Sequence, residues 1–219
     1  MPRPSRHLDR ALVAAGRELL PVHGCSGLTI RQVSEAAGVN AGMFHYHFRT
    51  REAFLRAVMQ NAYEEMFSRL TLGIAKEATA TANLRTAFRV LGRFLLDNRA
   101  LMARILADAL AGDEIAREFL KDNFPRHLGV LMMLVEAGQT AGELRPMAAT
   151  QAVAFCAGAI ALPILVGGSI ADSGTLDPAF AAGLRADILS EVGLDERIDL
   201  ALAALVASGA KPKRKGGTP

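Results

Sequence analysis

Apolar residues return every three or four positions along most of the chain, and this spacing is typical of helices that bury one face. In the first segment Leu8, Leu12 and Leu19 share such a face, which predicts a helix from residue 8 to residue 22. The pattern stops at Gly24, and glycine is a residue at which helices commonly end.

Two short helices are predicted next, and each follows a residue that can satisfy the free amides of a first helical turn. Thr29 precedes one run, which Gly38 ends. Asn40 begins the other, in which Phe44 and Phe48 stand one turn apart and are expected to face inward. A tight turn between two short helices indicates a helix-turn-helix, in which the first helix holds the second so that it can enter a DNA major groove.

The rest of the pattern predicts longer helices. Thr50 can cap a fourth helix, whose apolar positions continue to Leu70. Pro125 and Pro178 are expected at helix starts, where proline is tolerated, and Gly193 is expected to divide the last helix. The predicted helices beyond the fourth cover residues 83–97, 99–110, 113–122, 125–142, 147–170 and 178–208.

Composition supports an all-α globular protein. Hydrophobic residues make up 51% of the 219 residues and charged residues 21%, which excludes a disordered chain. Aromatic residues are only 5% and Trp is absent, so residues that favour strands are too sparse to build a sheet. Cys25 and Cys156 are too few and too far apart for a zinc cluster, and they indicate a reduced, intracellular protein. Cys25 could sense oxidants if exposed, but a buried thiol is expected.

Charge is distributed unevenly along the chain. Residues 1–60 carry eight arginines and four acidic residues, whereas residues 61–210 carry thirteen basic and eighteen acidic ones. The tail, residues 211–219, adds four basic residues and no acid. A basic front end on an acidic body suits a first segment that meets a polyanion, although arginines on a solvated surface would give the same pattern.

The third predicted helix has an unusual outer face. Val33, Ala37, Val39 and Phe44 supply the hydrophobic wedge of the helix-turn-helix, and Ser34 is small enough for a close crossing. At about 100° per residue, Ala41, Phe44 and Phe48 group on the inner side of the third helix, and Gly42, Met43, His45 and Tyr46 lie on or beside the opposite side. Tyr and His can donate to phosphates, Met can contact a thymine methyl, and Gly allows close backbone approach. We therefore expect this face to meet DNA, the alternative being a surface that contacts nothing.

Residues 28–54, LTIRQVSEAAGVNAGMFHYHFRTREAF, resemble the DNA-binding domain of the TetR (tetracycline repressor-like) family of bacterial regulators. The resemblance covers about the first 60 residues, and beyond them it is one of length and helicity. His45 stands where the family commonly has Tyr, and Met43 where it has a small or hydroxyl residue. Carried onto matching positions, the resemblance implies DNA contacts by Thr29, Arg31, Asn40, Ala41, Gly42, Met43, His45, Tyr46, His47 and Arg51.

The resemblance also implies a domain organisation and a mode of action. We expect a DNA-binding domain over residues 1–55, a helical effector-binding and dimerisation domain over 56–210, and a flexible basic tail over 211–219. The protein would be a homodimer on a palindromic operator, acting as a repressor that a small, largely apolar effector releases. A ligand-independent regulator or an activator is the alternative, and a helical enzyme or a membrane-associated protein is a more distant one.

Apolar surface supports the dimer and a ligand cavity. The charge-free stretch 151–165 would be poorly covered in a monomer, as would the cluster of Leu200, Leu202, Leu205 and Val206. Adaptable apolar side chains spread over several helices could line a cavity, with His127 as a polar anchor, although core packing would explain the apolar ones equally well. These candidates are Met102, Leu106, Phe119, Phe124, His127, Met132, Met133, Phe155 and Cys156.

Other functions lack a matching pattern. His45 and His47 are two apart on a helix and point different ways, so no metal or other cofactor is expected. No nucleophile elbow or phosphate-binding glycine loop occurs, so no enzyme activity is expected. The first 16 residues lack the continuous apolar stretch of a secretory signal, so the protein is expected in the cytoplasm. Residues 146–171 carry no charge, but Pro163 and the glycines after it favour a buried helix over a membrane span.

Overall fold

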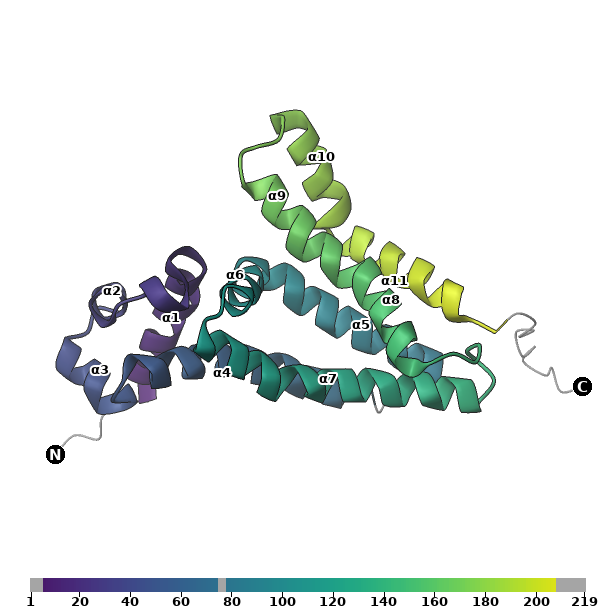
Figure 1. Cartoon of the computed structure of the whole chain (residues 1–219), viewed down its shortest axis with the longest axis horizontal. Coiled ribbons are helices and arrows are strands. Elements are labelled where there is room, and N and C mark those ends of the chain that lie inside the picture. Colours follow the sequence, from purple (N-terminus) through teal and green to yellow (C-terminus); the bar gives the residue numbers. More distant parts are fainter. Residues whose placement is uncertain (1–5, 75–77, 208–219) are drawn as a thin grey trace, which may run out of the picture.

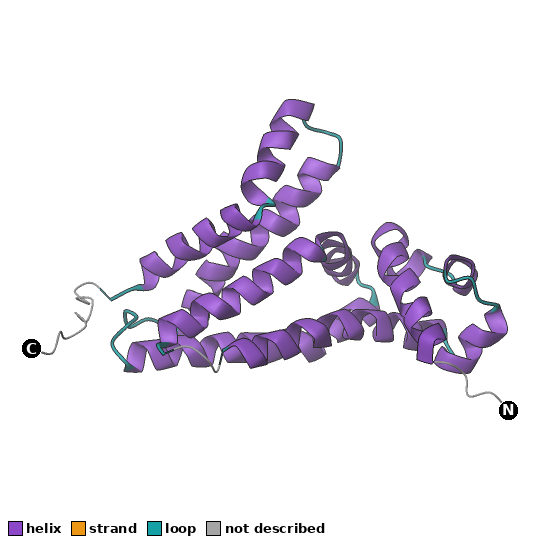
Figure 2. Ribbon diagram, turned by 180° about the vertical axis from the view of Figure 1, so that it is seen from behind, coloured by secondary structure: helices purple, strands orange, loops and turns teal. Residues whose placement is uncertain are grey.

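The computed structural model describes residues 6–74 and 78–207. Within these ranges the chain is helical, and its single extended pairing is an isolated bridge between Leu144 and Val206 (Figure 2). This confirms the all-α prediction. The helices are α1 (Arg6–Gly27), α2 (Ile30–Ala36), α3 (Ala41–Phe48), α4 (Arg51–Gly73), α5 (Ala80–Asp97), α6 (Arg99–Leu110), α7 (Glu114–Thr140), α8 (Ala149–Leu162), the π-helical segment η1 (Pro163–Gly167), α9 (Gly168–Asp172), α10 (Pro178–Ile188) and α11 (Glu191–Leu205).

Helices α1 to α3 and the start of α4 form a head at one end of the molecule (Figure 1). The predicted caps are confirmed: the side chains of Thr29, Asn40 and Thr50 accept hydrogen bonds from amides of the following first turns. Phe44 is fully buried, and its ring centroid lies 5.1 Å from that of Phe54 on α4. The head is therefore fixed by local caps and by an aromatic cluster.

The body is a bundle in which α4 and α7 run along one side and α5 packs against both (Figure 1). Because α4 runs without a break from the head into the body, the expected boundary at residue 55 falls inside one helix. Helix α8 packs on α7 and α11, and the α9–α10 hairpin projects away from the bundle.

Two predicted helix boundaries were wrong. Pro125 lies inside α7, so the helices predicted at 113–122 and 125–142 are one. Packing on both sides of the proline, at buried Phe119 and Leu131, offsets the loss of one amide. The last helix divides at Ser190, whose hydroxyl caps α11 at 3.1 Å from the Gly193 amide.

The apolar stretch predicted as one helix over 147–170 is helical without a gap over Ala149–Asp172, and the π-helical segment η1 within it was not predicted. The stretch consists of α8, η1 and α9, and its segment Ala149–Asp172 is long and apolar enough to cross a membrane. One side of this segment packs in the core through Cys156, Ile160 and Ile164, all nearly inaccessible to solvent. The stretch is thus one wall of the bundle, with its other side exposed.

Candidate nucleic-acid interface and apolar cavity

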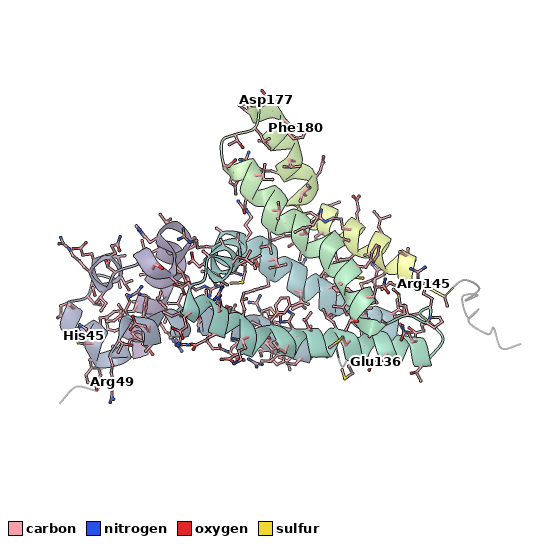
Figure 3. The ribbon with its side chains drawn as sticks, in the orientation of Figure 1. His45, Arg49, Glu136, Arg145, Asp177 and Phe180 are labelled. Atoms are coloured by element: carbon pink, nitrogen blue, oxygen red, sulfur yellow. The ribbon has the colours of Figure 1, made fainter. Side chains whose placement is uncertain are left out.

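Helix α3 presents two contrasting faces. Phe44 on the inner face is completely buried, whereas Tyr46 on the outer face is 64% exposed. Gly42 and His45 are also exposed, as predicted, and Met43 is half-buried. Ala41, expected on the inner side, is exposed instead, because it begins α3 ahead of the turn that packs on α4. His45 projects from the outer end of the head (Figure 3).

The histidines of α3 differ in their surroundings. His45 Nδ1 lies 3.2 Å from the carbonyl oxygen of Arg49, so this ring also holds the end of α3. His47 is half-buried, its ring lies edge-on to that of Tyr46 at 5.4 Å, and its Nε2 has no hydrogen-bond partner among the described residues. Tyr46 is therefore the most available of the three polar rings for an external partner.

The predicted contacts at Thr29 and Arg31 lie at the outer surface of α2. Thr29 is exposed, and its hydroxyl donates to Gln32 Oε1 at 2.7 Å within the helix cap. Arg31 pairs with Glu35 one turn later, at 2.7 Å between Nε and Oε1. That pair is largely exposed, so it contributes little stability and a phosphate can replace the carboxylate.

Arg51, also predicted to contact DNA, is bound within the protein by part of its side chain. Its Nη1 donates to the carbonyl oxygens of Cys25 and Leu28, so part of the guanidinium braces the end of α1. Arg49, which sequence analysis missed, is exposed at the end of α3 with a positive φ of 55° (Figure 3). An Arg directly after the second inward phenylalanine was the signal that could have found it.

Helix α6 joins the head to the body. The amide of Cys25 donates to Asp108 Oδ2 at 2.7 Å, and Arg104 Nε donates to Asp108 Oδ1 at 2.8 Å. Gly24 has a φ of 70°, and a Cβ there would collide with the guanidinium of Arg104. Burial and the nearby carboxylates of Asp113 and Asp108 raise the pKa of the Cys25 thiol to about 12, so it is a buried thiol and not an exposed sensor.

An apolar cavity of about 210 Å³ lies between α4, α5, α6, α7 and α8–η1. Met102 and Leu106 of α6 line it, so the helix that holds Cys25 also forms part of the cavity wall. Of the predicted lining residues, the structure brings together Met102, Leu106, Phe119, Phe124 and His127.

Four predicted lining residues lie outside the cavity. Cys156 and the half-buried Met132 pack in or against the core. Met133 and Phe155 are each about half exposed, because their helices α7 and α8 turn these positions outward. Sequence analysis missed Tyr63 and Asn123, which line the cavity. Tyr63 shares a helical face with Met59 and Met66, which was the available signal.

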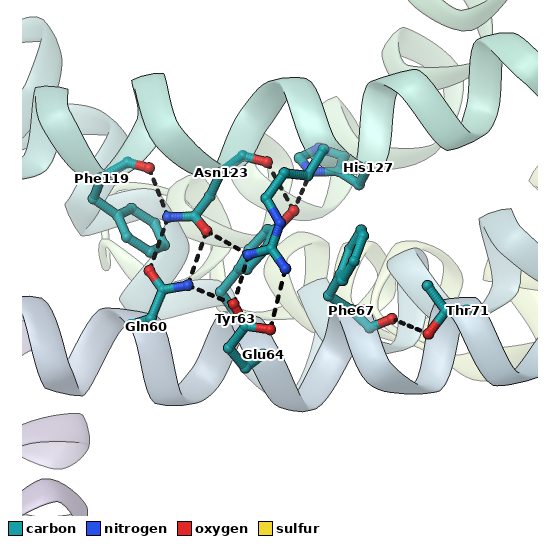
Figure 4. A network of polar contacts seen from close by, with 9 residues as sticks. Gln60, Tyr63, Glu64, Phe67, Thr71, Phe119, Asn123 and His127 are labelled. Carbon is teal, nitrogen blue, oxygen red and sulfur yellow. Dashed lines mark hydrogen bonds and ion pairs between the residues drawn. The ribbon is translucent and has the colours of Figure 1, made fainter.

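A polar cluster borders the cavity between α4 and α7 (Figure 4). Tyr63 donates to the carbonyl oxygen of Asn123 at 2.7 Å, and its hydroxyl lies 3.3 Å from His127 Nδ1. Burial raises the pKa of Tyr63 to about 12 and lowers that of His127, the latter opposed by a hydrogen bond to the Asn123 backbone. Arg126 pairs with Glu64 at 2.5 Å and stacks on the ring of Phe67. Both cavity-lining titratable groups are therefore held neutral.

Two neighbouring helices leave apolar side chains uncovered. On α8–α9 the exposed ones are Phe155 and, two turns later, Leu162, Val166 and Ile170, which follow one another about one turn apart. Leu200 of α11 is 72% exposed, and Val206 after it is 40% exposed. Leu202 and Leu205, expected to be uncovered as well, are instead buried against α5 and α8.

Comparison with known proteins agrees with this arrangement. Residues 12–58 match the model of a family described as bacterial regulatory proteins, tetR family. Among solved structures the chain is similar to the ketosteroid transcriptional regulator KstR2 of Mycobacterium tuberculosis, with a TM-score of 0.66 and 17% identity over 94% of this chain and 98% of that one.

Two further structures are similar over most of their length. PfmR, a TetR family regulator from Thermus thermophilus, has a TM-score of 0.65 and 16% identity over 91% of this chain and 98% of that one. The transcriptional regulator FadR from Bacillus subtilis, in complex with stearoyl-CoA, has a TM-score of 0.63 and 17% identity over 83% and 98%. No curated protein sequence matches the chain. The family match and these shared folds confirm the resemblance found in residues 28–54.

Proposed function

We propose that this chain, whose residues 12–58 match the model of the tetR family of bacterial regulatory proteins, is a homodimeric repressor of that family, released from a palindromic operator by a small, largely apolar effector. The observation that carries the proposal is the outer face of α3, where Tyr46 is 64% exposed beside His45 and Gly42 while Phe44 anchors the opposite face. An exposed aromatic and glycine face on a pinned short helix suits a major groove better than solvent.

Basic side chains flank this face. Arg31 and Arg49 are exposed on either side of the α2–α3 turn, and we assign them to phosphate or base contacts. Thr29 and Asn40 cap these two helices, and with Ala41, Gly42, Met43 and His47 of α3 they complete the proposed contact set. Arg51 would act mainly by holding the end of α1, through its bonds to the carbonyls of Cys25 and Leu28.

A second copy of the chain is the proposed cover for the apolar face of α8–α9 and α11. Leu162, Val166 and Leu200 are each about half exposed or more, on two helices that pack side by side. Large exposed apolar side chains gathered on neighbouring helices are typical of a protein interface, and a two-fold symmetric one would present two α3 helices to DNA. Two such helices about 34 Å apart engage half-sites one helical turn apart.

Helix α6 is the proposed link between effector and operator. Met102 and Leu106 contact the cavity, and Asp108 holds the Cys25 amide of the head. An effector that binds better when α6 is displaced would shift the population toward heads spaced wrongly for DNA. A coupling free energy of about 1 to 3 kcal/mol is enough for regulation. The open cavity favours this over a ligand-independent regulator, which would have its core filled by side chains.

Selection of DNA from a random pool by the purified protein tests the proposal directly. We expect enrichment of an inverted repeat whose half-site centres lie about 10 base pairs apart. Replacing Tyr46 by Ala should abolish the enrichment, whereas replacing Arg69, an exposed arginine on the body part of α4, should not. Recovery of a pool without any shared sequence would contradict a sequence-specific regulator.

A further inference from the structure

The polar cluster at the cavity restricts what chemistry the cavity can accept. Among the described lining residues only Tyr63, Asn123 and His127 carry polar side chains. The Asn123 amide is already saturated: its nitrogen donates to Phe119 O at 2.9 Å and Gln60 Oε1 at 3.0 Å, and its oxygen accepts from Gln60 at 3.0 Å and Arg126 at 3.1 Å. Asn123 therefore has nothing left to offer a ligand.

The hydroxyl hydrogen of Tyr63 is also used in a hydrogen bond within the protein. Its hydroxyl has one hydrogen, which the 2.7 Å bond to the carbonyl oxygen of Asn123 takes up. The neighbouring contact, 3.3 Å between Tyr63 Oη and His127 Nδ1, must then have Nδ1 as its donor. The pair thereby fixes the tautomer of His127, with the proton on Nδ1.

The remaining ring nitrogen of His127 is consequently an acceptor. A neutral imidazole carries a single N–H, and the burial that lowers the pKa of His127 keeps it neutral. No described residue donates a hydrogen bond to Nε2. Phe124 stands edge-on to the ring at 5.1 Å and is half exposed, so the imidazole lies close to where the cavity meets solvent.

The charge of the cavity lining and the volume of the cavity further restrict the class of ligand that can bind. No Arg or Lys lines the cavity within the described parts of the chain, so a carboxylate or phosphate inside it would be buried without a counter-ion, which is costly. The volume of about 210 Å³ exceeds the roughly 150 Å³ that accommodates benzene in a protein interior. A molecule of one or two rings therefore fits the space.

We propose that the cavity selects an uncharged, compact hydrophobic alcohol or phenol, whose hydroxyl donates a hydrogen bond to Nε2 of His127. The inference rests on the proposed function, because it names the class of effector for that same cavity. Ketones, ethers and thioesters offer only acceptors, which face the lone pair of Nε2 unfavourably. A site arranged to pair with a hydroxyl discriminates strongly against an analogue that lacks it.

Binding of three matched probes to the full chain tests the proposal. Naphthol, its methyl ether and naphthoate share one ring system and differ in donating a hydrogen bond or carrying a charge. By calorimetry we expect naphthol to bind at least about tenfold more tightly than the ether, equivalent to about 1.4 kcal/mol, and naphthoate not to bind detectably. Equal affinities for naphthol and ether, tighter binding of naphthoate, or no binding of any probe would overturn the proposal.

Two variants assign the selectivity to His127. His127→Phe should reduce the naphthol-to-ether ratio to near one, whereas His127→Gln, which keeps a side-chain acceptor, should retain part of it. An unchanged ratio of naphthol to ether affinity in His127→Phe would contradict the role of Nε2. If a variant does not fold, the ratio measured on the wild-type chain still tests the ligand class. Measuring operator binding without any probe tests the proposed regulatory function separately. Sequence-specific DNA binding without a preference for naphthol would refute only the proposed ligand class. A preference for naphthol without DNA binding would refute only the proposed regulatory function.

Discussion

Asp108 accepts a hydrogen bond from the backbone amide of Cys25 at 2.7 Å, so one carboxylate of α6 holds the last part of α1. The amide is buried, and the same carboxylate binds Arg104 at 2.8 Å. Gly24, the residue before Cys25, has a non-helical φ of 70° and ψ of 175°, so the Asp108 bond lies at a kink in α1. Asp108 is thus one link between head and body, beside the bonds from Arg17 to Asn98 and from Ser26 to Asp113, and it holds two partners at once.

Removing the Asp108 carboxylate should weaken the contact between α6 and the end of α1, which we call the joint between head and body. Asp108→Ala removes the side-chain acceptor of the buried Cys25 amide and the ion-pair partner of Arg104. We expect a loss of about 1 to 3 kcal/mol in the free energy of unfolding, measured by urea denaturation. Asp108→Asn keeps an acceptor oxygen and should lose less. Asp122→Ala on α7 removes an exposed carboxylate and serves as the control; an equal effect in both alanine variants would argue against the joint.

The Cys25 thiol should report on opening of the same joint. It is fully buried and its pKa is raised to about 12, so almost no thiolate is present near neutral pH. In a Cys156→Ala background, we expect Ellman's reagent to react with the native protein much more slowly than with the urea-unfolded chain. Asp108→Ala should accelerate the native reaction. Rapid labelling of the folded wild-type joint would show that it opens freely.

Arg51 and Tyr46 should separate stability from DNA affinity. Arg51→Ala removes donors to the carbonyls of Cys25 and Leu28, so it should lower the free energy of unfolding by about 1 to 2 kcal/mol. Tyr46→Ala removes an exposed ring and should leave stability within about 0.5 kcal/mol while weakening operator binding. Urea denaturation and fluorescence anisotropy with labelled operator measure the two effects. The reverse pattern would place Arg51, and not Tyr46, at the DNA.

Charge on the uncovered face of α8–η1 should prevent dimerisation. Leu162→Asp and Val166→Asp place carboxylates where 58% and 47% of these side chains are exposed, so the monomer should fold unchanged while an apolar interface should not form. Light scattering coupled to size-exclusion chromatography measures the mass. Leu72→Asp, at an equally exposed leucine near the end of α4, is the matched control. A dimer that survives both interface variants would have to use another face.

Stability should decrease on the acid side because of His127. Burial lowers its pKa from the usual 6.5, so between the folded pKa and 6.5 the unfolded chain binds more protons than the folded one. The free energy of unfolding therefore rises with pH through this interval, and the penalty is complete below the folded pKa. Tyr63, with its pKa raised to about 12, stays neutral throughout. Comparing urea midpoints at pH about 5 and about 7.5, His127→Phe should show a smaller difference than wild type; an identical difference would contradict this assignment.

Sequence signals that act over a few residues predicted the helices of the head correctly, but they identified only some of the residues that line the cavity. The caps at Thr29, Asn40 and Thr50 act within three residues of themselves, so their sequence context is sufficient. Tyr63 and His127 meet only because α4 packs on α7, and no spacing within either helix encodes that pairing. Arg51 is similar, since its acceptors lie on the far side of the helix-turn-helix. Pro125 remained helical for the same reason, because tertiary packing outweighed its local preference.

Because of the π-helical segment η1, the number of residues between α8 and α9 matters as much for the fold as the identity of their side chains. Within and beside it, Ala161 and Leu165 face the cavity, while Leu162 and Val166 face outward. Deleting one residue here would rotate everything downstream by about 100° relative to α6, which would carry Asp172 away from Arg99. Single-residue insertions and deletions in Pro163–Gly167 should therefore be far less tolerated than conservative replacements, and relatives that share this cavity should keep the same spacing between α8 and α9.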